Sequence, residues 1–226
     1  MTQQLKNELS NIRTAIDDGS YRAGVWQKLL RELDLLDQQT RHSLRDEVSE
    51  VSNALHARHN HLKAAFWPIY LLELILIVTA AWLTSTDQLY AMLLAIFLLA
   101  LTLQPTIKVT TGLLLGVRYS YAYLWYFEPR FKMRYGDYAA CARWRRVLLN
   151  LMGSIGTPLA MGIGMSLLQD NSYLYWLCAA GLIGFSLMQL VAFFAALAGL
   201  KRVGPMTLRH LTTPATLGFE LRQMIG

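Results

Sequence analysis

Long apolar stretches separated by short polar turns occupy residues 64–200. Four of them are candidate membrane-spanning helices: 64–84, 89–103, 147–168 and 173–200. About 20 apolar residues in a helix are needed to cross the hydrocarbon core of a bilayer. The second stretch is shorter, so we expect its helix to continue through Pro105 to Lys108, whose ammonium group can reach the interface. The pattern predicts an all-α, polytopic membrane protein whose four helices form two hairpins.

Residues 1–63 have a different pattern, in which apolar side chains recur at helical spacing among polar ones. The first stripe predicts a helix that ends at the Asp-Asp-Gly-Ser sequence of residues 17–20. A second helical run begins near Tyr21, and Ser43 with Asp46 resembles a capping pair at which it breaks or restarts. The stripes are heptad-like, and they predict a coiled-coil-like cytoplasmic module.

Helices with one apolar face need something to pack against. The partner of these stripes can be a neighbouring helix of the same chain, a second copy or another protein. The second run is longer than the first helix that would cover it. We therefore expect residues 1–63 to form a homo-oligomer or bind a partner protein, and the alternative is a short intramolecular hairpin that caps the membrane domain.

The segment at about 105–146 separates the two pairs of apolar stretches and is rich in aromatic and basic residues. Eight Lys or Arg side chains lie within residues 104–146, against two acids, Glu128 and Asp137. Aromatic rings with cations are typical of a membrane–water interface, where the cations meet anionic head groups. The residues expected at these head groups are Arg118, Arg130, Lys132, Arg134, Tyr123 and Trp125.

The conformation of this segment is less clear from its sequence. Tyr119, Tyr123 and Tyr126 would share one face of a helix lying in the headgroup plane. Alternate residues from Tyr119 to Phe127 are aromatic, which would also suit a strand. Because no second strand is evident in the sequence, we expect the helix.

Charge predicts the orientation in the membrane. The turns between paired stretches contain Asp87 and Asp170, whereas residues 104–146 and the tail after residue 200 together contain twelve Lys or Arg. Cationic loops stay in the cytoplasm, so both termini are expected there, in a multi-pass protein of the inner membrane. The expected division is a module at 1–63, a membrane domain at 64–200 and a cytoplasmic tail at 201–226. Topology explains the basic residues, and no nucleic-acid partner is expected.

Glu73 is the most informative single residue, because a carboxylate inside a span is unfavourable unless it is protonated, paired or hydrated. With Gln189 it forms the expected set of polar residues that would line a pore or lie within the membrane. The alternative is a structural Glu73 that joins helices through hydrogen bonds. The partners considered for that role are Thr79, Thr102, Gln104 and Gln189.

Two other patterns have structural or chemical interpretations. Gly156, Ala160 and Gly164 recur every four residues, which predicts close packing of helix backbones. His56, His59 and His61 precede the first span, and we expect them to face solvent or head groups. A metal site and a pH-sensing role are the alternatives for these histidines.

These features favour a non-enzymatic, oligomeric membrane protein without cofactors, which forms or gates a path for an ion or small solute, or permeabilises the bilayer. A defence-type effector is one setting that fits. A membrane scaffold that recruits a partner is the first alternative. The second is a lipid-modifying enzyme using Arg130, Lys132, Arg134 and a general base from Glu128, Asp137 or a histidine.

Overall fold

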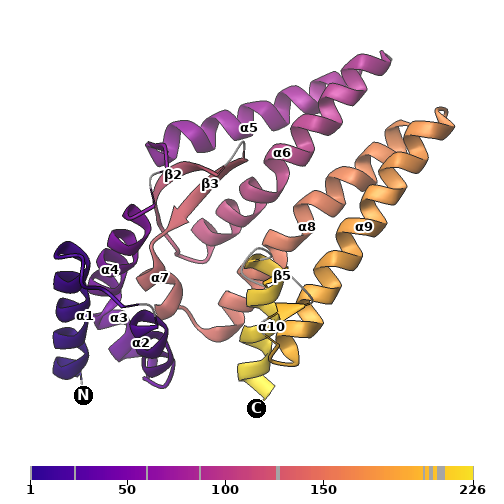
Figure 1. Cartoon of the computed structure of the whole chain (residues 1–226). Coiled ribbons are helices and arrows are strands. Elements are labelled where there is room, and N and C mark those ends of the chain that lie inside the picture. Colours follow the sequence, from indigo (N-terminus) through magenta and orange to yellow (C-terminus); the bar gives the residue numbers. More distant parts are fainter. Residues whose placement is uncertain are drawn as a thin grey trace. The chain divides into compact units, whose positions relative to one another are not determined.

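The chain folds into two units. The computed structural model describes residues 2–22, 24–59, 61–86, 88–125, 128–200, 202–203, 206–207 and 212–225. The N-terminal unit combines residues 1–66 with 113–142, and the long-helix unit combines residues 67–112 with 143–226. Figure 1 traces the chain through both units. These units divide the chain differently from the three consecutive segments expected from the sequence.

Four helices begin the N-terminal unit: α1 (Thr2–Asp17), α2 (Val25–Asp34), α3 (Gln38–Ser43) and α4 (Arg45–Ala57). The first helix ends where expected, and Gly19 just beyond it has a φ of 78°, which side-chain-bearing residues rarely adopt. The second run is broken twice rather than once. The Asp37 carboxylate caps α3 by accepting a hydrogen bond from the Thr40 amide at 2.9 Å. Ser43 instead donates to the Thr40 carbonyl oxygen at 2.8 Å.

The apolar stripes of these helices meet in one core inside a single chain. Its buried members are Leu5, Leu9, Ile12, Leu29, Leu33, Leu36, Leu44, Val48 and Val51. A short helix, α7 (Tyr135–Ala140), packs against α4, where the Gly136 amide donates to Ser49 Oγ at 3.0 Å. Each buried Leu or Val stabilises the fold by about 1.5–3 kcal/mol. Because the chain itself covers these stripes, they supply no reason for a second copy.

A three-stranded antiparallel sheet replaces the expected headgroup helix, and that expectation is wrong. The central strand β2 (Tyr119–Trp125) pairs with β1 (Lys63–Ala64) on one side and β3 (Glu128–Met133) on the other. The all-α class therefore holds only as a mostly helical one. Pro129 lies in β3, an edge strand, where its missing amide hydrogen can be tolerated.

The pairing of β2 with β3 shifts register between Tyr119 and Tyr121. Tyr119 stacks on Phe66 with ring centroids 5.3 Å apart, whereas the Tyr121 hydroxyl lies 2.9 Å from His56 Nδ1 on α4. Ser120 also meets α4, through a 3.1 Å hydrogen bond from Asn53. The irregularity thus lets one strand present aromatic rings to two different surroundings.

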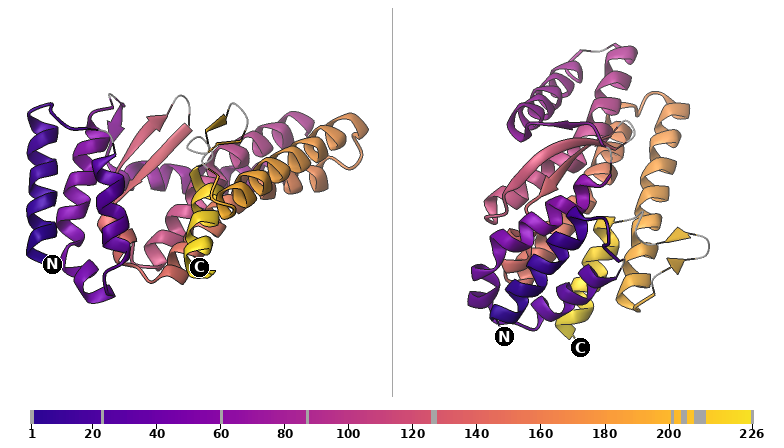
Figure 2. Two further views of the ribbon diagram at one scale, coloured as in Figure 1. Left: turned by 60° about the horizontal axis from the view of Figure 1, so that its bottom comes forward. Right: turned by 60° about the vertical axis from the view of Figure 1, so that its left-hand side comes forward.

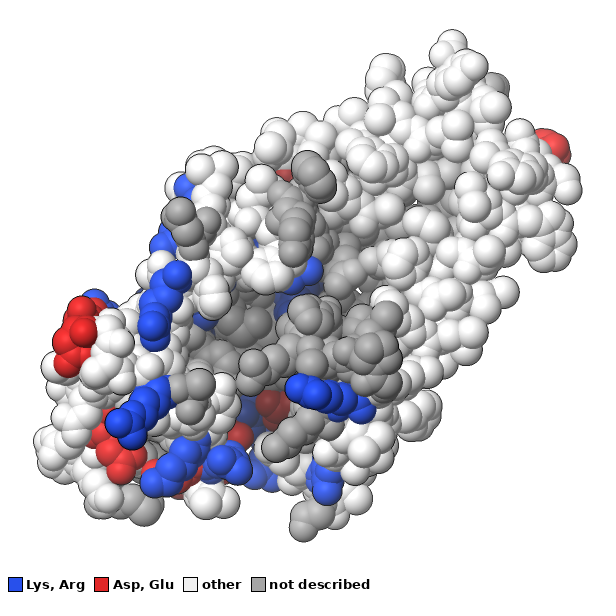
Figure 3. All heavy atoms as spheres, viewed as in Figure 1, with Lys and Arg blue, Asp and Glu red and all other residues white. Residues whose placement is uncertain are grey.

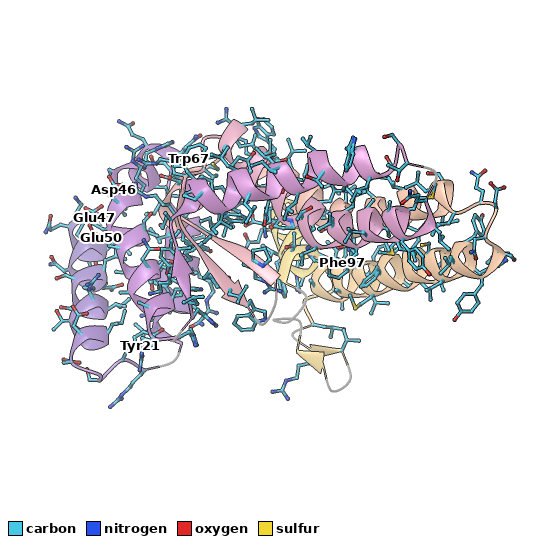
Figure 4. The ribbon with its side chains drawn as sticks, turned by 90° about the horizontal axis from the view of Figure 1, so that it is seen from above. Tyr21, Asp46, Glu47, Glu50, Trp67 and Phe97 are labelled. Atoms are coloured by element: carbon cyan, nitrogen blue, oxygen red, sulfur yellow. The ribbon has the colours of Figure 1, made fainter. Side chains whose placement is uncertain are left out.

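Within the described residues, four helices are long and apolar enough to cross a membrane. They are α5 (Phe66–Leu83), α6 (Leu89–Leu114), α8 (Arg143–Leu167) and α9 (Ser172–Leu197). As expected, α6 continues through Pro105 and Lys108. Only 17–39% of each apolar window is buried within the chain, and Trp67 and Phe97, labelled in Figure 4, are about three-fifths exposed. Such extensive apolar exposure is compatible with contact with lipid.

Small residues pack the long helices closely, as the four-residue repeat predicted. A Cβ atom on Gly156 of α8 would overlap the backbone of Gln104 on α6. Ala160 is fully buried in a cluster with Ala80, Ala95 and Leu99. A Cβ atom on Gly164 would lie 2.9 Å from the Cys178 sulfur on α9. These contacts lie within one chain.

The C-terminal segment adds structure to the long-helix unit. Strands β4 (Arg202–Val203) and β5 (Met206–Thr207) pair, and α10 (Thr212–Ile225) packs along α9 and α8, as Figure 2 shows. Ala215 is buried against Ala192 and Ala196 of α9. Residues 212–225 are thus part of the packed helices. Lys201, which follows the last predicted span, and Asp87 lie outside the described residues.

Candidate functional site

Glu73 lies in the interior of the long-helix unit, with 2% of its surface exposed. It projects from α5, and its Oε2 atom accepts a 2.9 Å hydrogen bond from the hydroxyl of Thr106 on α6. Thr106 is 5% exposed. The sequence did not suggest Thr106 as a partner for Glu73, although it lies one turn after Thr102, which it did suggest.

A second hydrogen bond joins the same two helices one turn away. The Tyr70 hydroxyl on α5 lies 2.8 Å from Thr110 Oγ1 on α6, and Thr110 donates to the Thr106 carbonyl oxygen at 2.7 Å. Since Tyr70 precedes Glu73 while Thr110 follows Thr106, the helices run antiparallel. The side chains of these four residues form a polar row between two otherwise apolar helices. Gln189 is half-buried on α9.

Sequence reasoning missed a buried ion pair in this unit. Arg146 on α8 and Glu220 on α10 bring Nε and Oε2 to 3.3 Å, and their side chains are 2% and 9% exposed. Lys108 Nζ donates to Thr213 Oγ1 at 3.0 Å, which ties α6 to the same C-terminal helix. Burying a charge costs free energy, so a buried ion pair indicates a specific contact between the two helices that carry it. The sequence placed Arg146 in the basic interface segment and Glu220 in a tail, so nothing local linked them.

Arg118 and Arg134, which were expected at lipid head groups, form ion pairs within the N-terminal unit. Arg118 donates three hydrogen bonds to the Asp137 carboxylate, at 2.8 and 2.9 Å from its guanidinium and at 3.2 Å from its backbone amide. Arg134 donates to Asp46 Oδ1 at 2.6 Å. Burial alone would raise the pKa of Asp137, but its hydrogen bonds to Arg118 and the nearby cationic charges lower it. Each of these arginines already has a carboxylate partner. Their ion pairs therefore join segments of the N-terminal unit to one another.

Other cationic residues, Lys63, Arg130 and Lys132, lie on the side of the sheet that faces α4. We name this surface the histidine face. It comprises His56, His59, His61, Lys63, Tyr121, Tyr123, Trp125, Arg130 and Lys132. Lys132 Nζ donates to Ser52 Oγ at 2.7 Å, and Lys63 Nζ lies 5.2 Å from the centre of the Tyr121 ring. The Arg130 guanidinium lies 5.4 Å from the Trp125 ring. Among the described residues, neither lysine forms an ion pair.

Aromatic contacts place the three histidines together. Their ring centroids are 5.6, 5.9 and 6.4 Å apart. Tyr123 lies 4.5 Å from His56 and 5.4 Å from His61, and Trp125 lies 5.0 Å from His61, all measured between ring centroids. The sequence indicated the proximity of the histidines to one another, but their contact with this sheet was not foreseen.

Electrostatics on the histidine face disfavour additional protons. Burial lowers the pKa of His56 to about 4, helped by the positive charges of Lys132, His61, His59 and Lys63. Burial also lowers the pKa of Lys132 to about 8. Each of the neighbouring groups that lower the pKa of His56 is cationic when protonated. The histidine face therefore favours an anion over a further cation.

The enzyme alternative gains little from this geometry. Asp137 is held by Arg118, so it is a poor general base, and the side chain of Glu128 lies outside the described residues. In the described part of the chain, no group of three or more His, Cys, Asp or Glu side chains is arranged to hold a metal ion.

The geometry thus offers two candidate sites, the Glu73 row in the long-helix unit and the histidine face in the N-terminal unit. Comparisons with protein families, with curated proteins and with solved structures find no match for this chain.

Proposed function

We propose that this chain is a non-enzymatic, multi-pass protein of the inner membrane that gives protons or another small cation a path through the bilayer. The observation that carries the proposal is the burial of Glu73 between α5 and α6, where Thr106 donates to it. A carboxylate in such surroundings can bind a proton or cation and release it when the helices move apart. A simple membrane anchor would not require it.

The proposed topology has four spans in two hairpins, with both termini cytoplasmic. The pairing of Lys63 with Tyr123 supports it, because β1 directly precedes α5 and β2 closely follows α6. The start of α5 and the end of α6 are thus both joined to the same sheet by short stretches of chain, so this pair of helices would begin and end on one side of a membrane. On the face seen in Figure 3, Lys and Arg of the long-helix unit gather near one end of its helices, as the positive-inside rule requires.

Reconstituted flux tests the role of Glu73. The full chain in liposomes carrying an internal pH dye should dissipate an imposed proton gradient faster than protein-free liposomes. Glu73→Gln should slow the flux at least tenfold, because the amide cannot exchange a proton at this position. Flux unchanged by Glu73→Gln, or a wild-type rate equal to that of empty liposomes, would contradict the proposal.

A matched pair of threonine substitutions refines the assay. Thr106→Val removes the donor to Glu73, whereas Thr79→Val removes a hydroxyl that bonds the Ile75 carbonyl oxygen of its own helix. Thr79 is half-buried, and its hydrogen bond is exposed to the surroundings. Thr106→Val should shift the pH at which flux is half-maximal, and Thr79→Val should not. Equal effects of the two changes would indicate a general response to lost hydroxyl groups.

The second candidate function is a membrane scaffold, favoured by a cavity of about 380 Å³ between α1 and α2. Ile12, Ala15, Tyr21 and Leu29 are among the residues that line it. An apolar side chain of a partner protein would fit there. Ala15→Trp should fill the cavity and abolish cross-linking to that partner, while the exposed change Arg13→Gln should preserve it. Cross-linking that survives Ala15→Trp would exclude the cavity as the docking point.

Homo-oligomer formation through residues 1–63 stays a prediction. Because those residues share a unit with residues 113–142, their deletion would expose the core and the sheet. Light scattering of the intact chain in detergent is therefore the appropriate measurement. A monomer under these conditions would contradict the oligomer.

A further inference from the structure

Two lysines of the histidine face have no ion-pair partner among the described residues. Lys132 is half-buried in β3 and donates to Ser52, and Lys63 of β1 lies over the Tyr121 ring. Neither contact neutralises a charge. In contrast, Arg118 and Arg134, in the same unit, are matched by Asp137 and Asp46.

Sheet geometry gathers these charges on one face. Lys63 is directly opposite Tyr123, Tyr121 is directly opposite Lys132, and Tyr123 is directly opposite Arg130. Directly opposed residues project to the same side of a sheet. Three cationic side chains from two strands therefore project to the side on which α4 supplies His56.

A hydrogen-bonding atom on this face also lacks a partner within the described part of the chain. His61 Nε2 is buried, and no described atom forms a hydrogen bond with it. Its ring lies 5.4 Å from that of Tyr123 and 5.6 Å from that of His56, measured between centroids. In the tautomer that carries its proton on Nε2, His61 would donate to a bound oxygen atom. Cationic groups with such donors are suited to a phosphate, which offers several acceptor oxygens and negative charge.

Aromatic rings beside the cations, together with exposed leucines of the same chain segments, favour a lipid as the source of the phosphate. Leu62 is 77% exposed and Leu124 is 41% exposed, and the Leu124 amide donates to the Leu62 carbonyl oxygen at 3.0 Å. Successive residues of a strand point to opposite faces, so these leucines lie on the face of the sheet away from the lysines, while Tyr123 and Trp125 lie on the lysines' own face. Aromatic rings with cations, flanked by exposed apolar side chains, form the combination that enters the headgroup region of a bilayer.

From these observations we propose that the histidine face is a phosphate-binding site, formed by Lys63, Lys132 and His61, that takes the head group of an anionic phospholipid. This site lies in the N-terminal unit and does not depend on the Glu73 path. It also replaces Arg118 and Arg134 as the residues that meet the head group.

Binding to the full chain in neutral detergent tests the site. The probes are inorganic phosphate, phosphatidylglycerol and phosphatidylcholine with the same acyl chains, each followed by equilibrium dialysis. Wild type should bind phosphatidylglycerol at least tenfold more tightly than phosphatidylcholine. Lys63→Gln combined with Lys132→Gln should remove that preference, and Arg13→Gln, an exposed α1 control, should keep it. Tight binding of inorganic phosphate without a preference between the lipids would overturn the lipid assignment and give the site to a soluble phosphate.

Two further measurements guard against misfolding of the double variant. Lys132→Arg keeps the charge and should keep the preference, and Lys63→Gln alone changes only a surface residue and should weaken binding severalfold. Binding should also raise the pKa of His56, measured by the pH dependence of its ring resonances. An unchanged lipid preference in the folded double variant, or no wild-type binding of any phosphate probe, would overturn the proposal. Proton flux of the same double variant should match wild type, which separates this site from the Glu73 path.

Discussion

The contact between α6 and α8 gives a sharp test of how the long helices pack. A Cβ atom on Gly156 would lie 2.5 Å from the Gln104 amide nitrogen and 2.7 Å from the Gln104 Cβ. Favourable contacts between such atoms begin near 3.5 Å, so Gly156→Ala must separate the helices by roughly 1 Å. The overlap involves backbone, which cannot rotate aside. Overpacking of this kind costs about 1–3 kcal/mol.

Gly162 of the same helix is the matched control, because a Cβ atom there would have no described atom within 4 Å. Gly162→Ala should stabilise the chain by up to about 1 kcal/mol through helix propensity. The same propensity gain applies to Gly156→Ala, so the free energies of unfolding of the two variants in mixed micelles should differ by the overpacking cost alone, about 1–3 kcal/mol. Equal values, or a more stable Gly156→Ala variant, would refute the close approach of α6 and α8.

Three other substitutions follow from the ion pairs and the buried histidine. Glu220→Ala removes the carboxylate that α10 places beside the buried Arg146. It should lower the free energy of unfolding by about 3–5 kcal/mol and expose α10 to proteases. An unaltered digestion pattern would contradict this expectation. Asp137→Ala removes three hydrogen bonds from Arg118 and should cost about 2–3 kcal/mol in chemical denaturation, whereas replacing the exposed Asp17 should have little effect. Folding lowers the pKa of His56 from its ordinary value of 6.5 to about 4, so the unfolded chain takes up this proton first as the pH falls. Its stabilising effect is complete above pH 6.5 and is lost as the pH falls towards 4, by about 2 kcal/mol after allowance for partial solvent exposure. His56→Gln should remove that part of the pH dependence seen by hydrogen exchange in α4, and an identical profile would exclude His56 as its source.

Local patterns were sufficient for the helices but insufficient for the sheet. Apolar length predicted all four long helices, and helical spacing predicted α1 and the end of α1 at Asp17. The sheet depends on pairing between residues far apart in sequence, since Lys63 meets Tyr123. With only two residues, β1 carries no recognisable alternation, and Pro129 makes β3 resemble the end of an element.

The same limit applies to the candidate sites. The burial of Glu73 could be predicted because a carboxylate inside an apolar helix must be accommodated somewhere. The sequence did not single out Thr106 as a partner, since the facing residue depends on the rotation of α6 about its axis, and that rotation places Thr106 towards Glu73. Three dimensions are also needed to distinguish a cation that has a carboxylate partner from one that has none among the described residues. Arg118 and Lys132 look alike in sequence, and only the fold brings Asp137 to the first.

The β1–β2 pairing has a consequence for the order of folding. Residues 67–112 include nearly all of α5 and α6, and they lie between the two segments that build the N-terminal unit. Synthesis delivers Lys63 well before Tyr123, so β1 must wait for its partner until both long helices have left the ribosome. Completion of the sheet would then be a late event, which follows the synthesis of α5 and α6. A ribosome-bound chain stalled before β2 should contain the α1–α4 helices without the strand pairing. The N-terminal unit would therefore be complete only after the first two long helices have been synthesised.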